Sequence, residues 1–295
     1  GAFHALLRNR QQRGTLDLDL PEKQVVVNDK GEVTGIESRE RLDAHRLIEE
    51  FMIAANVAAA QTLERKQAPC MYRVHTPPDE DKVDALRETL KTYGINLAKD
   101  QSARPEAFGR VLEQVKGRAE APMLNQMILR CQSQAYYSPD NEGHFGLALD
   151  RYAHFTSPIR RYSDLLVHRA LIDALGMGED GLRPGEADQF EEIGEHISVT
   201  ERRAQKAEFD AIDRFTAAFL KEQIGAQFQG RVGGVTRFGL FVTLSETGAD
   251  GLVPINTLPN DFYKHDEANH RLVGERWGRV YRLGDKVRVR LTEAD

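Results

Sequence analysis

The hydrophobic pattern of the chain changes once, at about Gly225. Before this point, apolar residues recur every three or four positions over long stretches, which is the period of a helix. After it come short alternating segments separated by glycines, at residues 228–232, 239–244, 251–253 and 286–291. Short strands spaced in this way favour a small barrel of the OB type. We therefore predict an α+β chain with two domains: a mainly helical domain with a small antiparallel sheet (residues 1–224) and an all-β OB domain (residues 225–295, its last strand possibly incomplete).

Composition limits the class of protein and its compartment. The 295 residues are 40% hydrophobic and 29% charged, and no apolar run approaches the length of a membrane span, so we expect a soluble globular chain. Cys70 and Cys131 lie far apart and lack a metal-ligand spacing, which favours a reducing, cytoplasmic setting. No signal peptide precedes the first predicted helix. The sequence leaves the oligomeric state open, and we expect a monomer.

Charge is unevenly distributed along the chain. The net charge of −6 argues mildly against a protein that coats nucleic acid. Residues 276–290, however, contain six basic side chains and one acid, and Lys286 and Arg288 lie within this segment. Phe238 and Phe241 precede it and, beside basic residues, suit a nucleic-acid-binding OB surface; a core position for either ring is the alternative.

Alternation near the amino terminus predicts a small sheet. Leucines alternate with polar residues over 15–20, and apolar segments at 24–28 and 33–36 flank a turn. Asp17 and Asp19 could form a metal pair, but the pattern is that of a half-buried strand and no third acid is close in sequence, so a strand is favoured.

Helical periodicity predicts a helix over residues 43–65. Its apolar face would carry Ile48, Met52, Ala55 and Ala59. On so apolar a helix, Glu49 and Glu50 require either a partner in a cleft or simple exposure, because an unpaired buried carboxylate is costly. Further helices are expected at residues 2–10, 122–135 and about 187–222, one around Val83 to Leu90 that stops at Gly94, and one around Phe108 to Val115 that ends at Gly117.

The stretch from Gly143 to Arg169 concentrates more chemically capable side chains than any other segment. Ser157 followed by Pro158 is typical of a helix start, because serine caps free N–H groups and proline at the first helical position loses no hydrogen bond. We therefore predict a helix that begins at Pro158. Its apolar face would carry Ile159, Tyr162, Leu166 and Ala170.

A second face of the same helix would carry Arg160, Asp164 and His168 at four-residue steps. A helix start with Arg160 and Arg161 in its first turn combines exposed N–H groups with bidentate donors, which favours phosphate binding. The alternative is structural, with Arg160 paired to Asp164 and Arg161 solvated.

The same stretch resembles the signature of the RNB family of exoribonucleases. Similar motifs recur elsewhere in the chain, at Arg41, Asp43-Ala44-His45, Leu47-Ile48-Glu49-Glu50, Ala55-Asn56, Arg73-Val74-His75, Glu201-Arg202-Arg203-Ala204 and Ala207-Glu208. The tail from Phe228 resembles the S-one type OB domain that follows the catalytic domain in this family. The resemblance therefore covers nearly the whole chain.

The resemblance implies an activity and roles for particular residues. It implies processive hydrolysis of single-stranded RNA from the 3′ end to nucleoside 5′-monophosphates, with Mg²⁺ ions held by aspartates. Arg160 would neutralise charge on the phosphoryl oxygens as the catalytic arginine. Glu49 or Glu50 would lie near the 3′-terminal ribose, and the wall of the site would be formed by Tyr152, His154, Thr156 and Arg161.

Two departures from the family pattern qualify this expectation. The aspartate-rich metal motif and the cold-shock domains of the family are absent, and Asp79-Glu80-Asp81 and Glu179-Asp180 lie at a predicted helix start and in a loop. We therefore expect the Mg²⁺ ligands in a missing amino-terminal part, and a chain that is inactive alone; a non-catalytic RNA-binding chain is the alternative. Pro254 stands where family tail domains often have a histidine.

Overall fold

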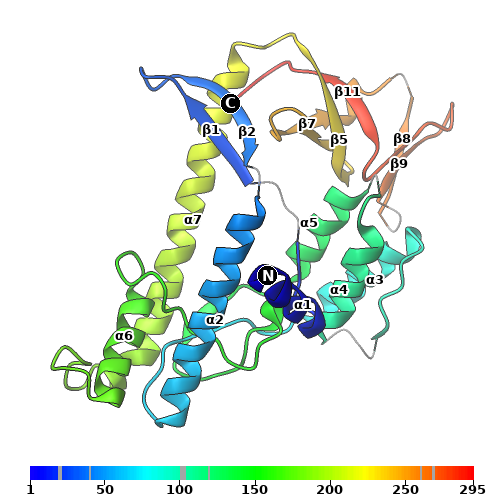
Figure 1. Ribbon diagram of the computed structural model, residues 1–295. Helices are drawn as coiled ribbons and strands as arrows, with labels where there is room; N and C mark the ends of the chain where they lie inside the picture. Colours follow the sequence, from blue (N-terminus) through cyan, green and yellow to red (C-terminus); the bar gives the residue numbers. More distant parts are fainter. Residues whose placement is uncertain (19–21, 40, 100–103, 119, 260, 268–269) are drawn as a thin grey trace. The chain divides into compact units, whose positions relative to one another are not determined.

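Helix α2 spans Asp43–Arg65 in the computed structural model, the bounds that its apolar period predicts. The structure describes residues 1–18, 22–39, 41–99, 104–118, 120–259, 261–267 and 270–295. The other helices are α1 (Ala2–Arg13), α3 (Glu80–Thr92), α4 (Pro105–Val115), α5 (Ala121–Cys131), α6 (Tyr162–Leu175) and α7 (Phe190–Lys221) (Figure 1). Within the described residues, no helix combines the length and apolar composition that a membrane crossing requires.

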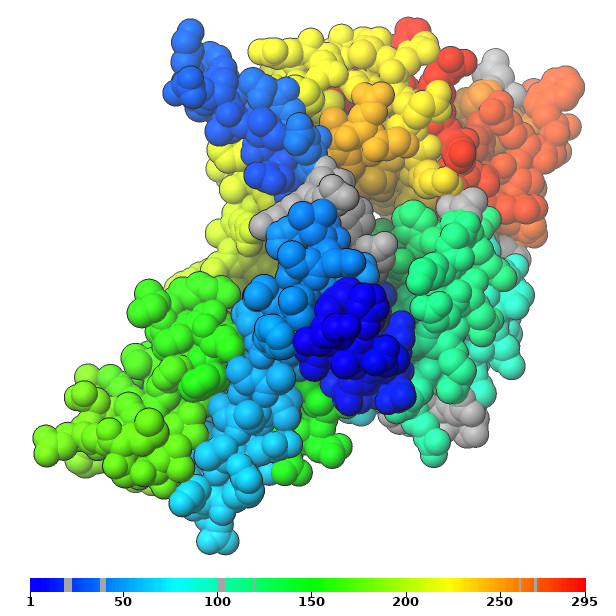
Figure 2. All heavy atoms as spheres, in the orientation of Figure 1, coloured from blue at the N-terminus to red at the C-terminus, as the bar shows by residue number. Residues whose placement is uncertain are grey.

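The chain divides into two units, each assembled from separate segments. The first unit contains Gly1–Leu18, Arg41–Gln114 and Met127–Gln205, and the second contains Asp19–Glu40, Val115–Gln126 and Lys206–Asp295. Short loops alternate with helices in the first unit, where α2 packs against α1 and α6. Figure 2 shows α1 lying on the surface of α2.

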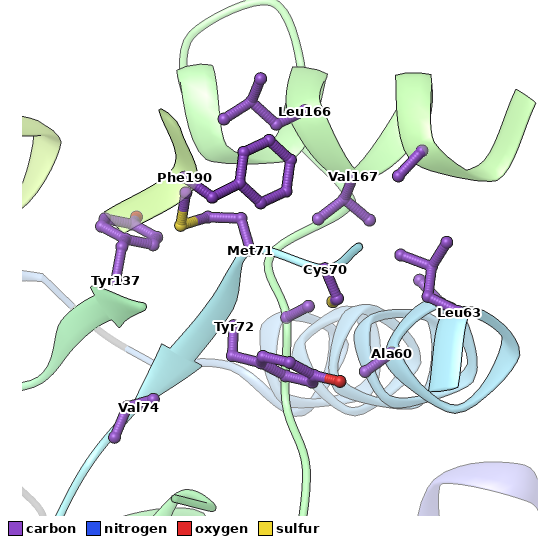
Figure 3. Close-up of a cluster of buried hydrophobic side chains, with 13 residues drawn as sticks. Ala60, Leu63, Cys70, Met71, Tyr72, Val74, Tyr137, Leu166, Val167 and Phe190 are labelled. Atoms are coloured by element: carbon purple, nitrogen blue, oxygen red, sulfur yellow. The ribbon is translucent and has the colours of Figure 1, made fainter. Parts of the chain in front are cut away.

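The core of the first unit forms around a short two-stranded ladder. Strands β3 (Tyr72–Val74) and β4 (Tyr136–Ser138) pair antiparallel. Around them pack fully buried side chains from α2 (Leu63), α6 (Leu166) and the start of α7 (Phe190), together with Met71, which directly precedes β3 (Figure 3). Burying a side chain of this size contributes about 1.5–3 kcal/mol, so this cluster stabilises the segments that carry the candidate site.

The buried face of α2 differs in part from the predicted one. Ala59 is buried as predicted, and Ile53, Asn56 and Leu63 are buried as well, whereas Ile48 is 56% exposed. The physical reason is that α2 has apolar residues on most of its circumference, so periodicity alone does not select the side that meets the core. Ile48 and Met52 instead line a cavity described below.

Strands build the second unit. Strands β1 (Glu22–Val27) and β2 (Val33–Arg39) form the predicted antiparallel hairpin. A four-stranded sheet has the order β11-β5-β6-β7, with bounds Lys286–Arg290, Gln227–Thr236, Gly239–Leu244 and Asp250–Pro254. A three-stranded sheet has the order β10-β9-β8, with bounds Val280–Arg282, Arg271–Gly274 and Tyr263–Asp266. The predicted class, a helical part followed by an antiparallel β region, is confirmed.

Two local predictions were wrong. Residues 15–18 form no strand, and Asp19 and Leu20 lie outside the described residues. Helix α6 begins at Tyr162, with Arg161 as its N-cap residue, rather than at Pro158. Residues 158–160 form a turn in which the N–H groups of Arg160 and Arg161 both donate to the Ser157 carbonyl.

Candidate functional site

The turn before α6 is organised by a buried carboxylate. Asp164 is fully buried, and its Oδ1 accepts hydrogen bonds from the Ser157 N–H at 2.7 Å and from Arg161 Nη2 at 2.9 Å. Its Oδ2 accepts from the Ser163 hydroxyl at 3.1 Å. The carboxylate thus holds the residues before α6 in a turn, and no side chain caps the first turn of the helix itself.

This arrangement contradicts the structural alternative for the two arginines. Arg161, not Arg160, pairs with Asp164, so the alternative pairing of Arg160 with Asp164 was wrong. Arg160 is exposed, and Ile159, expected on the apolar face, is 99% exposed. The turn therefore projects Arg160 into solvent while it holds Arg161 in place.

A cavity of about 300 Å³ adjoins Arg161. Its lining comes from one side of α2 and from the loop that precedes α6: His45, Ile48, Glu49, Met52, Ile53, Asn56, Tyr152 and Arg161. The apolar side chains of this wall include Ile48, Met52 and Ile53. Its charged groups are the Glu49 carboxylate and the Arg161 guanidinium. Such a mixed wall suits a ligand that has both an apolar ring and charged groups.

Asn56 fastens the loop to α2. Its Nδ2 donates to the Tyr152 hydroxyl at 2.8 Å, and its Oδ1 accepts from the Phe155 N–H at 2.9 Å. Asn56 is buried, so both contacts lie away from water. The amide therefore sets where the Tyr152 ring stands at the cavity wall.

His154 belongs to a polar network behind this wall. Its Nδ1 lies 3.0 Å from the Tyr137 hydroxyl, and the Arg73 guanidinium lies over the Tyr137 ring, 4.5 Å from its centroid. Arg73 also donates to Glu201 at 2.6 Å. Burial, followed by the positive charges of Arg161 and Arg73, lowers the pKa of His154 to about 2. His154 is therefore neutral at physiological pH.

Two further histidines hold the Gly143–Leu149 loop. His75 Nδ1 accepts from the Gly146 N–H at 2.8 Å while its Nε2 lies 2.9 Å from the Ser133 carbonyl, which assigns the neutral Nε2–H tautomer. Burial, followed by electrostatic interactions with His75 and Arg73, lowers the pKa of His144 to about 3. These side chains shape the loop.

Glu49 and Glu50 share a partner that sequence reasoning missed. Arg10 of α1 donates to Glu50 at 2.8 Å and to Glu49 at 3.1 Å. Arg41 also donates to Glu49, whereas Asp17 accepts from Arg10 at 3.3 Å. Glu49 lines the cavity, while the Glu50 side chain is only 5% exposed and is held by Arg10.

Thr156 and Arg161 each bury a polar atom without a hydrogen-bond partner among the described residues. These atoms are Thr156 Oγ1 and Arg161 Nε. Buried polar groups without partners are costly. The structure thus brings Glu49, Tyr152 and Arg161 to one cavity and His154 to the network behind it; for all predicted site residues, the binding and catalytic roles stay predictions.

The described residues do not fit a Mg²⁺ ion. No group of three or more histidine, cysteine, aspartate or glutamate side chains within them is arranged to hold a metal. Asp17 pairs with Arg10, and Asp79 caps α3 by accepting the Asp81 N–H at 3.0 Å. We therefore derive no step through a metal from these side chains.

The second unit carries an exposed face on its four-stranded sheet. Phe241 is 46% exposed, so a core position for its ring was wrong. Antiparallel pairing places Thr243, Arg231 and Lys286 opposite one another, and residues two apart on a strand share a face. Phe241 and Lys286 therefore lie on the same face of the sheet.

The rest of this surface follows from the same register. Arg288 lies two residues beyond Lys286 and is exposed. Phe238, in the turn between β5 and β6, is 60% exposed, so a core position for this ring was also wrong, and the Arg237 guanidinium lies 4.6 Å from its centroid. The sheet thus presents rings and cations together.

Both parts of the chain match known protein families. Residues 2–177 match the RNB domain, and residues 221–295 match the S1 RNA binding domain. The chain is 48% identical over 293 residues to ribonuclease R of Aquifex aeolicus, and the match covers 99% of this chain and 41% of that protein. For ribonuclease R of Escherichia coli the identity is 39% over 297 residues, covering 98% and 36%. The chain thus spans about two fifths of the length of these relatives.

Solved structures agree with the sequence matches. The apo form of Mycoplasma genitalium RNase R matches with a TM-score of 0.91 at 31% identity, covering 99% of this chain and 46% of that one. The same enzyme in complex with ribose methylated single-stranded RNA matches with a TM-score of 0.90, at the same identity and coverage. With a domain match over more than half of its residues, this chain belongs to the RNB family, and an S1 RNA binding domain follows its RNB domain.

Proposed function

We propose that this chain is part of a ribonuclease R-type exoribonuclease that processively removes nucleoside 5′-monophosphates from the 3′ end of single-stranded RNA. The observation that carries the proposal is the turn anchored by Asp164, which holds Arg161 at the cavity and leaves Arg160 exposed. Relatives that cover nearly all of this chain are ribonuclease R enzymes, and one of them was solved with single-stranded RNA.

Each residue of the candidate site has its own role in this proposal. Arg160 meets the scissile phosphate and neutralises the charge that develops on its oxygens. Arg161 and Glu49 hold the terminal nucleotide in the cavity, the guanidinium through phosphate and the carboxylate through ribose hydroxyls. The Tyr152 ring, together with Ile48 and Met52, offers apolar surface to a base.

The proposal includes Mg²⁺ as the cofactor, a cytoplasmic location and a monomeric state. Mg²⁺ supplies activation of the attacking water when it is bound. Its ligands would lie outside the described residues, because no three-ligand cluster exists among them. The free thiols of Cys70 and Cys131 are compatible with a reducing compartment.

Replacement of one exposed arginine tests this function. In the gene product that contains this chain, Arg160→Ala is expected to lower the single-turnover rate of RNA shortening by about 10²–10³-fold, because a transition-state donor is lost. RNA affinity should change little. Arg65→Ala, at another exposed arginine, serves as the control. Near-normal turnover of Arg160→Ala would contradict the assignment.

A second candidate function is non-catalytic binding of single-stranded RNA by this 295-residue chain. The lack of a three-ligand metal cluster among the described residues favours it. The chain alone would then bind single-stranded RNA with an affinity that falls as salt rises, and would leave the RNA length unchanged. Gel analysis that shows Mg²⁺-dependent trimming by this chain would exclude this candidate.

A further inference from the structure

The chain has one tryptophan, and its ring is largely exposed. Trp277 is 79% exposed in the turn between β9 and β10, and Phe262, directly before β8, is 66% exposed. Because Tyr263 pairs with Gly274 across β8 and β9, the residue before β8 lies beside that turn. The Glu275 N–H donates to the Phe262 carbonyl at 2.9 Å, which confirms the proximity of the two backbones.

A dense set of hydrogen bonds holds both rings outward. The Asp261 carboxylate accepts from the N–H groups of Phe262 at 2.8 Å, Arg276 at 2.8 Å and Trp277 at 3.0 Å. The turn is closed by a bond from the Gly278 N–H to the Gly274 carbonyl at 3.1 Å, and Gly278 has a φ of 64°. The two rings are therefore exposed because the hydrogen-bonded turn fixes the backbone that carries them.

Arginine side chains lie beside the rings, in addition to the Asp261 carboxylate that the backbone N–H groups bind. The Arg276 guanidinium lies 5.2 Å from the Phe262 centroid, and residues 271–282 contain four arginines against the single acid Glu275. Arg271 is paired with Asp266 at 2.7 Å, and Arg276, Arg279 and Arg282 are exposed. Rings with cations beside them bind single-stranded nucleic acid without sequence preference, since bases stack on the rings and phosphates meet the cations.

We propose that Phe262, Arg276 and Trp277 form a stacking site for single-stranded RNA, separate from the face that carries Phe241. The two sites belong to different sheets, the new one at the three-stranded sheet and the other on the four-stranded sheet. The identity of the ligand rests on the proposed function, and the exposed guanidinium groups of Arg276, Arg279 and Arg282 are complementary to phosphates. At this site, one or two bases stack on Phe262 and Trp277 while Arg276 contacts a phosphate.

The sole tryptophan provides a site-specific readout in the full chain. Oligouridylate is titrated in EDTA while Trp277 emission is recorded, and binding of a labelled oligouridylate is followed by fluorescence anisotropy. We expect quenching to saturate at the RNA concentration that saturates the anisotropy signal. Inorganic polyphosphate, which lacks bases, should compete for binding without quenching the emission.

Variants separate the site from the rest of the surface. Trp277→Ala and Phe262→Ala are each expected to weaken RNA binding by about 5-fold to 100-fold, the range for loss of one base–aromatic stack. Trp277→Phe should retain most of the affinity. Phe209→Ala, at a ring that is 56% exposed on α7, is the control and should leave both affinity and quenching unchanged.

Four outcomes would overturn the inference. Normal anisotropy binding without quenching, together with unchanged affinity of Trp277→Ala, would remove this site and leave the proposed function intact. Quenching by polyphosphate equal to that by RNA would exclude base stacking. Emission that depends on protein concentration without RNA, and loses this dependence in Phe262→Ala, would assign the patch to contact with a second copy. Absence of RNA binding in both readouts would count against the proposed function as well.

Discussion

Two turns in this protein are organised by an aspartate, and they differ in burial. Asp164 in the RNB domain is fully buried and holds the turn that presents Arg160. Asp261 in the S1 domain is partly exposed and holds the turn that presents Trp277. Both carboxylates accept backbone N–H groups, so the local chemistry is the same.

The two turns differ in how strongly the stability of their domain depends on them. The Asp164 carboxylate pairs with a guanidinium away from water, where loss of one partner leaves an uncompensated charge. Water can replace a lost partner at Asp261. Loss of the buried Asp164 carboxylate should therefore destabilise the whole domain, whereas loss of the exposed Asp261 carboxylate should disorder only its own turn.

The largest effect is expected from Asp164→Ala. The change leaves the Arg161 guanidinium and the Ser157 N–H without their buried acceptor. We expect the free energy of unfolding to fall by about 3–5 kcal/mol. Denaturant titration followed by circular dichroism measures this loss, with exposed Asp150→Ala as the control. A loss no larger than that of the control would show that the buried turn behaves like the exposed one.

A smaller effect is expected from pH, through two partly buried histidines of the RNB domain. The pKa values of His154 and His144 are lowered to about 2 and about 3 by burial first and neighbouring positive charge second. As pH falls below 6.5, these histidines become protonated in the unfolded chain but stay neutral in the folded chain, so the free energy of unfolding falls. At pH 5 each histidine should account for about 2 kcal/mol of the loss.

Denaturant titrations at pH 5 and pH 7 test this assignment. His154→Phe should reduce the difference in unfolding free energy between the two pH values, whatever its effect on stability at pH 7. His196→Gln changes an exposed histidine of α7 and should leave the difference as it is in the original chain. An unchanged pH difference in His154→Phe would mean that His154 is protonated in the folded state.

The smallest effect on stability is expected from Asp261→Ala. The three N–H groups that it releases face water, so the denaturation midpoint should not change measurably. The local effect should be clear, because Trp277 loses its anchor and its steady-state fluorescence anisotropy should drop. A lowered denaturation midpoint, or unchanged Trp277 anisotropy, would contradict the role given to the exposed aspartate.

Acid titration tests the role of the Asp261 carboxylate in a second way. Hydrogen bonds from the Arg276, Trp277 and Phe262 backbones lower the pKa of Asp261 below its usual value of 3.8, against an opposing effect of partial burial. The stabilisation of the turn is therefore complete above pH 3.8 and is lost as pH falls through the lower folded pKa. A Trp277 emission change that precedes the loss of circular dichroism would identify the local step.

Sequence periodicity predicted the elements whose side chains follow one dominant local pattern. The bounds of α2 and the positions of the β1–β2 hairpin and of strands β5, β6, β7 and β11 came from alternation or helical period, although β5 continues four residues past its predicted end. Strands β3, β4, β8, β9 and β10 have three or four residues each and were missed, because so short a segment seldom shows a period. The start of α6 was misplaced, because capping preferences do not include a buried carboxylate seven residues away.

The sequence alone determined the family, the helical-then-β order and the set of residues around Arg160, because these depend on local composition and on motifs contiguous in the chain. Only the tertiary structure decided which of Glu49 and Glu50 lines the cavity and which arginine meets Asp164. The physical reason is that these contacts form between residues far apart in the chain: Arg10 lies 40 positions from Glu50, and it reaches both glutamates only after α1 packs on α2.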